Sequence, residues 1–360
     1  MHISNVKVSL VGPYPPPYGG ISVHIQRLKE QLERHHIRCI VYDNTQVAKR
    51  KADVIMVKNM LWWSLYQFLS RDEAIIHFHG YSPLLISILS LLAIIERKRV
   101  VVTLHSFRHD PKNMNLPNRF AFWIARKVQS CFLVVSPEIR DKIISLGIKP
   151  ENIKIIPSFI PPTISEEDLA EIPEAVWRFI DCHSPIILAN AFRISFYNNQ
   201  DLYGLDMCID LCANLKQSYP KIGFVFCLPD IGDFDYFKKM KQRISERQIE
   251  ENFLFQTKPC QMYPIIMKSD VFVRPTNTDG DAVSIREALY FKVPAVASDV
   301  CPRPDGTILF KSRDITDLTL KVLEVLDDYN EHKKQLEMIA LENNAEKIIK
   351  IYQKIAGDAK

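Results

Sequence analysis

Residues 270–289 read DVFVRPTNTDGDAVSIREAL and combine an apolar run, a polar turn and an amphipathic stretch. The apolar run DVFV (270–273) is typical of a buried strand, and a helical pattern begins near GDAV (280–283). In open α/β sheets, the turn between a strand and the following helix is where ligands bind. Two acids, Asp279 and Glu287, flank the start of the predicted helix. The stretch therefore predicts a strand–turn–helix unit with a candidate ligand site at its turn.

Short apolar runs rich in Val and Ile recur along the whole chain, separated by amphipathic stretches. In the first half they cover 6–12, 38–44, 74–80, 99–106, 131–137 and 152–158. In the second half they cover 185–191, 223–229, 252–258, 270–276, 294–300 and 306–312. This alternation indicates parallel sheets covered by helices on both faces. The predicted fold class is α/β, with two tandem Rossmann-like, doubly wound domains facing a central cleft in which ligand should bind.

A proline-rich, acidic stretch separates the two halves. It reads PSFIPPTISEEDLAEIPEA (157–175), and we expect regular structure to pause there because proline removes backbone donors. The predicted domains are residues 1–162 and 163–341. The tail 317–356 has apolar residues at helical spacing. A C-terminal helix over 342–360 is expected, and packing back on the first domain is one arrangement for it.

The composition is that of a globular protein with unevenly distributed charge. Of 360 residues, 47% are hydrophobic and 24% charged, which argues against a disordered chain and favours two domains. Residues 1–160 carry 22 Lys and Arg against 11 Asp and Glu, whereas residues 161–360 carry 24 against 31. The basic half is expected to face an anionic partner, such as a membrane surface or a phosphorylated acceptor, or else to serve solubility alone.

None of the eight cysteines belongs to a CxxC pair. Cys208 and Cys212 share a predicted helical face, but no histidine near them has zinc-site spacing. We interpret the cysteines as small buried apolar residues of a protein in a reducing compartment.

Neither a signal peptide nor a membrane-spanning segment is expected. The strand-like VKVSLVG begins at Val6, and the longest apolar run, Pro83 to Ile95, is shorter than the about 20 residues that a bilayer requires. We interpret that run as a buried helix and predict a cytoplasmic protein.

One segment favours contact with a membrane surface. KNMLWWSLYQFLSR (58–71) combines Trp62, Trp63, Tyr66 and Phe68 with basic ends. Such a pattern is typical of interfacial helices, and an aromatic helix packed in the core is the alternative. On the first interpretation the protein is peripheral on the inner face of the cell membrane.

The first predicted strand leads into a second candidate turn. In VGPYPPPYGGISVHIQRLKEQL (11–32), Gly19 and Gly20 precede an amphipathic helix. Free N–H groups, the positive end of the helix dipole and the small size of glycine suit a phosphate there. The stretch is not GxGxxG, and Asp43 is the one acid near the end of the second strand, so a dinucleotide cofactor is not favoured.

The spacing of Asp279 and Glu287 suits one elongated ligand. Eight residues of helix rise about 12 Å, so the two carboxylates cannot hold the same atom. They can accept hydrogen bonds from hydroxyls at opposite ends of a ligand, a sugar at one end and a ribose at the other. Phosphates between them would meet N–H groups at the helix start. Those N–H groups belong to Gly280, Asp281, Ala282 and Val283.

DGDAVSIREALYFKVPAVASDV (279–300) resembles the E-x7-E segment of family-4 retaining glycosyltransferases of the GT-B fold, including those of bacterial surface-polysaccharide synthesis. GGISVHIQRLKEQL (19–32), VVVTLHS (100–106) and VVSPEIRDKIISLGIKPENIKIIPS (134–158) resemble it too, so the likeness covers nearly the whole chain. It implies transfer of a sugar from a nucleoside diphosphate, UDP or GDP, to a saccharide or lipid-linked acceptor, with retained configuration. It also implies that the second domain holds the donor and the first the acceptor. No metal, no cofactor and no nucleic-acid partner are implied.

The resemblance assigns roles to particular positions. Glu287 would hold the ribose and Asp279 the hydroxyls of the donor sugar. The backbone near Gly280–Val283 and Gly19–Gly20 would meet the diphosphate and the sugar. His105 would lie against the donor sugar near the reacting carbon, unless it is a strand-end histidine bonded to a neighbouring loop.

Two further positions concern the leaving diphosphate, whose charge needs cations or dipoles in the absence of a metal. Arg193 matches the arginine that the family usually supplies. Tyr203 stands where the family usually has a lysine, and a phenol donates a hydrogen bond but carries no charge at neutral pH.

Departures from the family pattern leave alternatives open. Asp279 is one carbon shorter than the usual glutamate, and Ala282 and Lys292 replace glycines. With Tyr203, these changes are compatible with a non-catalytic GT-B protein, either a partner subunit or a sugar-nucleotide sensor. A nucleotide-sugar epimerase on the same fold is a further alternative, although we find no convincing acid and base residues for it. The histidines of HFH, His77 and His79, are interpreted as structural, on opposite faces of their strand.

Overall fold

In the computed structural model the chain forms two compact units. Unit 1 comprises Met1–Ile160 and Asn343–Lys360, and unit 2 comprises Pro161–Glu342. The structure describes residues 7–16, 18–45, 52–69, 75–96, 98–107, 109–127, 131–280, 282–339 and 343–357. The last helix of the chain therefore belongs to the unit that contains the first strand.

Unit 1 is built on a parallel sheet with the strand order β3-β2-β1-β4-β5-β6-β7 within the described residues. Its strands are β1 (Lys7–Gly12), β2 (Arg38–Asp43), β3 (Val54–Met56), β4 (Ile75–His79), β5 (Val100–Leu104), β6 (Cys131–Val134) and β7 (Ile153–Ile155). Its helices are α1 (Gly20–Arg34), α2 (Met60–Leu69), α3 (Pro83–Ile95), α4 (Leu116–Ala125), α5 (Pro137–Ser145) and α14 (Asn344–Gly357), with 3-10 turns η2 (Pro111–Asn113) and η3 (Pro150–Asn152).

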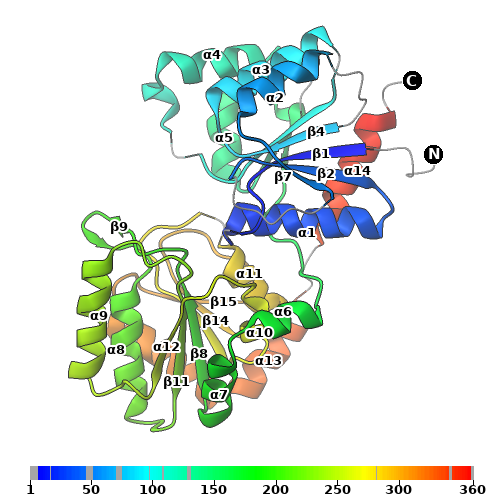
Figure 1. Ribbon diagram of the computed structural model, residues 1–360. Helices are drawn as coiled ribbons and strands as arrows, with labels where there is room; N and C mark the ends of the chain where they lie inside the picture. The colour runs from blue at the N-terminus through cyan, green and yellow to red at the C-terminus, as the bar shows by residue number, and fades with distance from the viewer. Residues whose placement is uncertain are drawn as a thin grey trace. The chain divides into compact units, whose positions relative to one another are not determined.

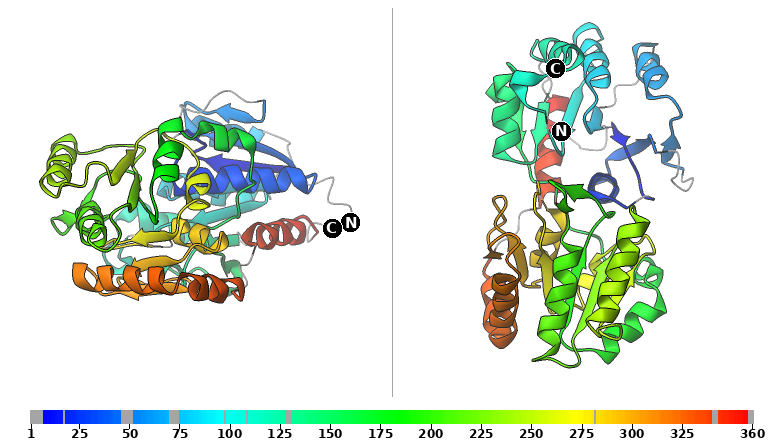
Figure 2. Two further views of the ribbon diagram at one scale, coloured as in Figure 1. Left: turned by 90° about the horizontal axis from the view of Figure 1, so that it is seen from below. Right: turned by 90° about the vertical axis from the view of Figure 1, so that its left-hand side faces the viewer.

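Helices cover both faces of this sheet (Figure 1). On one face α1 and α14 bury Leu28, Ile348 and Tyr352 in one apolar cluster with β1 and β2. On the other face α3, α4 and α5 form a second cluster that includes Leu89 and Phe122. The views of Figure 2 also place α14, drawn in red, beside the strands of unit 1. A parallel sheet needs this double cover because both of its faces are apolar.

Unit 2 repeats the design with a sheet of order β12-β11-β8-β13-β14-β15, again counting described residues. Its strands are β8 (Ile186–Asn190), β11 (Gly223–Cys227), β12 (Phe253–Gln256), β13 (Val271–Arg274), β14 (Ala295–Ser298) and β15 (Thr307–Phe310), with a hairpin of β9 (Phe196–Tyr197) and β10 (Gln200–Asp201) outside the sheet. Its helices are α6 (Glu166–Glu171), α7 (Glu174–Cys182), α8 (Leu205–Lys216), α9 (Phe234–Glu246), α10 (Tyr263–Ile266), α11 (Val283–Tyr290), α12 (Ile315–Asp327) and α13 (Tyr329–Glu337).

The two faces of this second sheet are covered by different helices. α8, α9 and α12 pack in one apolar cluster, and α7, α10 and α11 pack in another. Every neighbouring pair of strands in the sheet is parallel. The prediction of two Rossmann-like parallel sheets is thus confirmed, and each predicted strand segment contains a strand. β3 and the hairpin β9–β10 were not predicted, because they are too short to show alternation.

Two expectations about single segments were wrong. Residues 157–175 do not lack regular structure, because Ser165 caps α6 by accepting a hydrogen bond from the N–H of Asp168 (3.1 Å). α3 is not fully buried. Its inner face packs on the sheet, but Leu84 and Ile95 are 53% and 61% exposed, because this helix is apolar all round.

Two further features concern membrane spans and cysteines. No helix in the described parts of the chain is long and apolar enough to cross a membrane. All eight cysteines lie at described positions and none forms a disulfide. Cys208 and Cys212 are buried in the core of unit 2, as expected of small apolar residues, but Cys182 is exposed, so the interpretation of all the cysteines as buried was wrong.

Candidate functional site

The carboxyl end of the sheet in unit 2 gathers most of the predicted site residues. β8 and β13 are adjacent, and the strand order reverses between them, so this is the switch point at which doubly wound sheets bind ligands. Asn190 ends β8, and Arg274 ends β13. Asp279 follows β13 in the loop that leads to α11.

Asp279 is the centre of a buried cluster of polar side chains. Its Oδ2 accepts hydrogen bonds from Arg274 Nε (3.2 Å) and Arg303 Nη1 (2.9 Å), and its Oδ1 accepts one from the N–H of Gly280 (3.0 Å). Thr276 Oγ1 lies 3.3 Å from the same Oδ2 and accepts from Arg303 Nη2 (3.1 Å). The carboxylate therefore has two cationic partners within unit 2.

These two arginines decide the ionisation of Asp279. Its burial opposes the charged form, but the charges of Arg274 and Arg303 outweigh this, so the pKa of Asp279 lies below its ordinary value. Arg303 is itself fixed by donating from Nε to the carbonyl of Ser298 (3.0 Å), and Arg274 by donating from Nη1 to the carbonyl of Asn190 (3.1 Å). An ionised Asp279 thus connects the ends of β8, β13 and β14.

Tyr203 belongs to the same region. The guanidinium of Arg274 lies 5.0 Å from the centre of the Tyr203 ring, within the range of a cation–π contact. Asp201 fixes the backbone beside it by accepting from the N–H groups of Tyr203, Gly204 and Leu205 at 3.0, 3.1 and 3.0 Å. The phenol thus stacks on an arginine at the position where the family pattern has a lysine.

α11 carries the second predicted acid. Glu287 is 4% exposed, so its carboxylate is held inside unit 2, in the second turn of the helix. Ala282 is the N-cap of α11 and makes no side-chain cap, and Val283 is its first residue. A Cβ added to Gly280 would meet no described atom within 4 Å, so the space beside this glycine is open to a ligand. The predicted site residue Asp281 lies outside the described residues.

Arg193 is paired with a different acid, Asp230. Its Nε is 3.5 Å from Asp230 Oδ2, and half of its side chain is exposed. It lines a pocket of about 670 Å³ with Phe196, Gly232 and Asp233 among others. The guanidinium of Arg193 thus forms an exposed ion pair with Asp230. An anion of higher charge can replace Asp230 as its partner.

In unit 1 the paired glycines form the start of α1, as the sequence predicts. Gly19 is the N-cap, and its N–H donates to Ser22 Oγ (2.9 Å). A Cβ on Gly20 would meet no described atom within 4 Å, so the backbone at the first turn is accessible from outside. This is the geometry at which a helix start accepts an anion.

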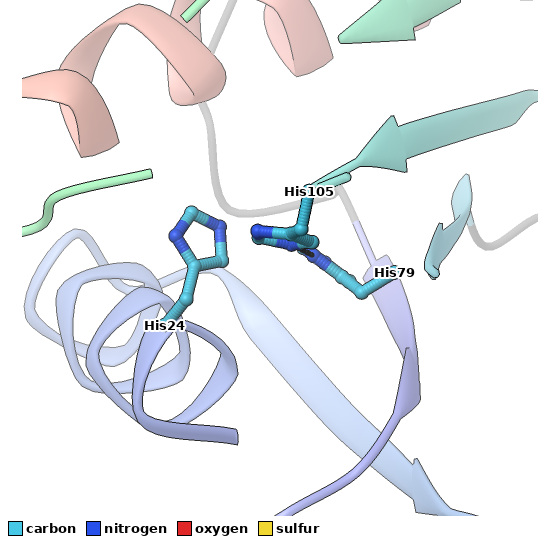
Figure 3. A group of neighbouring side chains, drawn as sticks. All are labelled: His24, His79 and His105. Atoms are coloured by element: carbon cyan, nitrogen blue, oxygen red, sulfur yellow. Dashed lines mark hydrogen bonds between the residues drawn. The ribbon is translucent and has the colours of Figure 1, made fainter. Parts of the chain in front are cut away.

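His105 follows β5 and belongs to a group of three histidines (Figure 3). Its Nδ1 lies 3.2 Å from Ser158 Oγ, and its Nε2 lies 3.3 Å from His79 Nδ1. His24 of α1 packs edge-on against it, with ring centres 4.8 Å apart. Burial holds the pKa of His105 and His79 well below the ordinary value, so both rings are neutral at pH 7.

The expectation that His77 and His79 lie on opposite faces of their strand was wrong. Residues two apart on a strand point to the same face, and the two rings are 3.9 Å apart. His77 bonds to Tyr352 and to Thr103 Oγ1 (2.6 Å) and so has a structural role. His79, in contrast, contacts His105 directly.

Sequence reasoning missed Arg274, Arg303 and His24. A charged residue directly after a buried strand, as in DVFVR, is a signal that could have identified Arg274. His24 could have been found from its place one turn after Gly20, on the same helix start. Arg303 follows β14, and no local pattern around it indicates that its side chain reaches Asp279.

Two family models match the chain. Residues 18–163 match the model Glycosyltransferase Family 4, and residues 194–343 match the model Glycosyl transferases group 1. The two sheets and these matches define a glycosyltransferase of the GT-B class. The chain belongs to the family-4 glycosyltransferases. No curated protein matched the sequence.

Solved structures share the fold over the full length. Anabaena HepE in complex with UDP is 17% identical, with a TM-score of 0.65 and coverage of 98% of this chain and 99% of that one. A glycosyltransferase from Rickettsia africae is 13% identical, with a TM-score of 0.71 and coverage of 99% and 100%. An Escherichia coli structure described as trehalose-6-phosphate bound with UDP-2-fluoro glucose is 12% identical, with a TM-score of 0.63 and coverage of 96% and 98%.

Proposed function

We propose that this glycosyltransferase moves a sugar, with retention of configuration, from a nucleoside diphosphate to a saccharide or lipid-linked acceptor in surface-glycan synthesis. The observation that carries the proposal is the start of α11. A buried carboxylate, Glu287, lies on this helix, and the open backbone at Gly280 precedes it, at the switch point of the sheet. Such a helix start binds phosphate, and the carboxylate behind it binds hydroxyls.

UDP is our proposed nucleotide, with GDP as the alternative. Support comes from solved structures of the same fold that hold UDP or UDP-glucose, Anabaena HepE among them. In this proposal Glu287 accepts from the ribose hydroxyls, and N–H groups at the start of α11 meet the diphosphate. Gly19 and Gly20, at the start of α1, offer the same kind of anion site in unit 1.

Arg193 is proposed to stabilise the leaving diphosphate without a metal. Its present partner, Asp230, is exposed and 3.5 Å away, so exchange for a phosphate costs little. His105 is proposed to lie against the donor sugar as a neutral imidazole. The carboxylate of Asp279 is already bonded to two arginines, and we assign it the role of ordering the loop before α11, beside the donor sugar.

A non-catalytic GT-B protein is the second candidate, and one observation favours it. The cation of the family's lysine is replaced by Tyr203, and Arg274 beside it is committed to Asp279 and Asn190. A sensor needs to bind a sugar nucleotide but has no need to stabilise its departure. An epimerase is the third candidate, and product analysis separates it from the other two.

The test is a panel of UDP-, GDP- and ADP-sugars incubated with the full chain, with and without saccharide acceptors. We expect turnover of a UDP-sugar to be unaffected by EDTA and the product to keep the donor's anomeric configuration in its NMR spectrum. Tight binding with no turnover would support the sensor, and an epimerised sugar nucleotide would support the epimerase.

Glu287→Gln tests the donor site. Losing a charge-assisted hydrogen bond to ribose should weaken UDP binding by about 1.5–3 kcal/mol in calorimetry. Glu324→Gln, at an exposed position of α12, is the control. Equal affinity of Glu287→Gln and the wild type would reject the ribose assignment.

We further propose that unit 1 contacts an anionic membrane that carries the acceptor. α3 packs against both α2 and α4, and the three helices share one side of unit 1 (Figure 1). Together they expose an α2–α4 patch of large apolar side chains. The patch consists of Leu61, Trp62, Leu65, Tyr66, Leu69, Leu84, Leu91, Ile94, Ile95, Leu116, Phe120 and Trp123.

Cations accompany this patch. Arg119, Arg126 and Lys127 are exposed on or next to α4, and Lys127 Nζ lies 3.9 Å from the centre of the Trp123 ring. A pocket of about 870 Å³ lies beside α4 and is lined by Phe120, Trp123 and Arg126 among others. Apolar side chains flanked by cations are what an anionic interface binds.

A further inference from the structure

We propose that His24, His79 and His105 of unit 1 bind a divalent transition-metal ion, for which Zn²⁺ is the natural choice by ligand chemistry. The three rings come from α1, the end of β4 and the residue after β5, and they converge on one point (Figure 3). One ring nitrogen from each lies within 4.8 Å of the others. Imidazole nitrogen suits Zn²⁺, Cu²⁺ or Ni²⁺, whereas Mg²⁺ and Ca²⁺ prefer oxygen.

The tautomer of His24 is fixed by its surroundings. Its Nδ1 lies 2.6 Å from the carbonyl oxygen of Ser158, which can only accept, so Nδ1 carries the proton. The remaining nitrogen, Nε2, therefore presents a lone pair. It is buried, in a ring 4% exposed, and has no hydrogen-bond partner among the described residues. A buried lone pair without a donor is costly, and a cation would satisfy it.

The outer nitrogens of His24 and His105 have the kind of partner that metal-bound histidines have. Ligating histidines usually donate their second N–H to a carbonyl or another polar group, which orients the ring. Here Ser158 serves two rings at once, through its carbonyl for His24 and through Oγ for His105 Nδ1 (3.2 Å). Both rings thus direct Nε2 toward the centre of the group.

The contact between His79 and His105 also fits a shared ion. His79 Nδ1 and His105 Nε2 are 3.3 Å apart. Two nitrogens held at about 2.0–2.1 Å from one tetrahedral Zn²⁺ lie about 3.3–3.4 Å apart. Without an ion this pair can form an N–H···N bond, and His79 Nε2 has no partner among the described residues in either case.

The role assigned to the ion is to tie α1 to the ends of β4 and β5. The inference shares His105 with the proposed function, so it is tested by metal binding and thermal unfolding, whereas the proposed function is tested by sugar-nucleotide turnover.

The test uses the full chain stripped with a chelator and then titrated with Zn²⁺, or with Co²⁺ as a spectroscopic probe, and with Mg²⁺ as a negative control. We expect one Zn²⁺ per chain, a higher unfolding temperature with Zn²⁺, and the visible absorption of low-coordinate Co²⁺. His24→Gln and His105→Gln should weaken Co²⁺ binding more than about 100-fold, since loss of an outer partner alone costs about 10–100-fold. His35→Gln, at the exposed end of α1, should change nothing.

Ser158→Ala keeps all three ligands and removes only Oγ, so it provides a test even if the histidine variants fail to fold. We expect it to weaken Co²⁺ binding by about 10–100-fold. The proposal is overturned if the wild type shows no one-to-one binding of Zn²⁺ or Co²⁺, or if His24→Gln binds as tightly as the wild type. Sugar-nucleotide turnover by the stripped protein reports separately on the proposed function.

Discussion

Asp279 shows how one residue can satisfy a sequence motif and yet have an additional role. By position it is the first acid of the E-x7-E segment, which the resemblance assigns to the donor sugar. In the structure its side chain is 13% exposed and bonded to Arg274 and Arg303. A carboxylate between two buried guanidinium groups neutralises charge that would otherwise be unpaired inside unit 2. Its shorter side chain therefore suits the ion pairs at least as well as contact with a sugar.

Asp279→Asn should lower the free energy of unfolding by about 3–5 kcal/mol, the cost of breaking a buried ion pair. A depressed carboxyl pKa contributes stability above the unfolded value of about 3.9, and that stability is lost only as the pH falls further. The cost should therefore be equal in urea unfolding at pH 7 and pH 5. Asp305→Asn, in the exposed loop after β14, is the control. A cost that vanished at pH 5 would contradict the assigned pKa.

Glycines 204 and 280 should respond in opposite ways to alanine. Gly204 has φ of +70°, and an added Cβ would lie 2.4 Å from the carbonyl oxygen of Pro275. Gly204→Ala should therefore cost at least about 2 kcal/mol of stability. Gly280→Ala meets open space and should leave the melting temperature within about 1–2 °C, but it should weaken UDP binding about tenfold or more, or 1.4 kcal/mol. Unchanged UDP affinity would show that no ligand approaches this backbone.

At the scale of elements, α2 fits both interpretations of its aromatic sequence. One face of the helix packs in the core and the other is exposed. Trp62 is 72% exposed, whereas Trp63 packs against the core cluster under α3, with its ring 4.9 Å from that of Tyr42. One helix thus has an aromatic core face and an aromatic outer face. Neighbouring tryptophans lie on different sides because successive helical residues are about 100° apart.

This division gives a matched pair of variants. Trp62→Ser should leave stability within about 0.5 kcal/mol and reduce binding to anionic vesicles, because it removes only exposed apolar surface. Trp63→Ser should cost about 2 kcal/mol or more. Vesicle flotation at two salt concentrations, with anionic and neutral lipids, measures the first effect. Absence of binding to anionic vesicles by the wild type, or equal binding to neutral ones, would remove the membrane proposal.

At the scale of the molecule, the first unit depends on the last helix. α14 contributes Ile348, Ile349 and Tyr352 to the core of unit 1, and Tyr352 bonds through its hydroxyl to His77. Asn344 Nδ2 donates to the carbonyl of Phe159 (2.9 Å), which fixes the start of the helix. The apolar core of unit 1 therefore includes residues from both ends of the chain, and it cannot form fully without α14.

Tyr352→Ala should destabilise unit 1 by about 3–5 kcal/mol, the cost of truncating a fully buried aromatic side chain. Trp177 is the tryptophan of unit 2, so fluorescence in a Trp177→Phe background reports on unit 1 alone. Leu320→Ala, at an exposed position of α12, is the control. If the fluorescence midpoint of Tyr352→Ala equalled that of the control, the dependence of unit 1 on α14 would be refuted.

Local sequence patterns were sufficient to predict most of the strands, their alternation with helices, and helix starts near residues 19–20 and 280–283. A buried parallel strand must be apolar along its length, and a helix start near a ligand must carry small residues. The E-x7-E segment was recognised by its resemblance to the pattern of the family-4 glycosyltransferases. The exposed face of α3 cannot be predicted from the sequence, because an apolar stretch does not say whether a neighbouring element will cover it.

Which side chains meet depends on the tertiary structure. Arg303 reaches Asp279 because β14 runs parallel to β13 and returns the chain to the same edge of the sheet. His24, His79 and His105 converge because β1, β4 and β5 are neighbours in the sheet, although the residues are far apart in sequence. α14 belongs to unit 1, although all of unit 2 lies between it and the rest of unit 1 in the sequence. Such contacts follow from strand order and register, which hydrophobic periodicity does not encode.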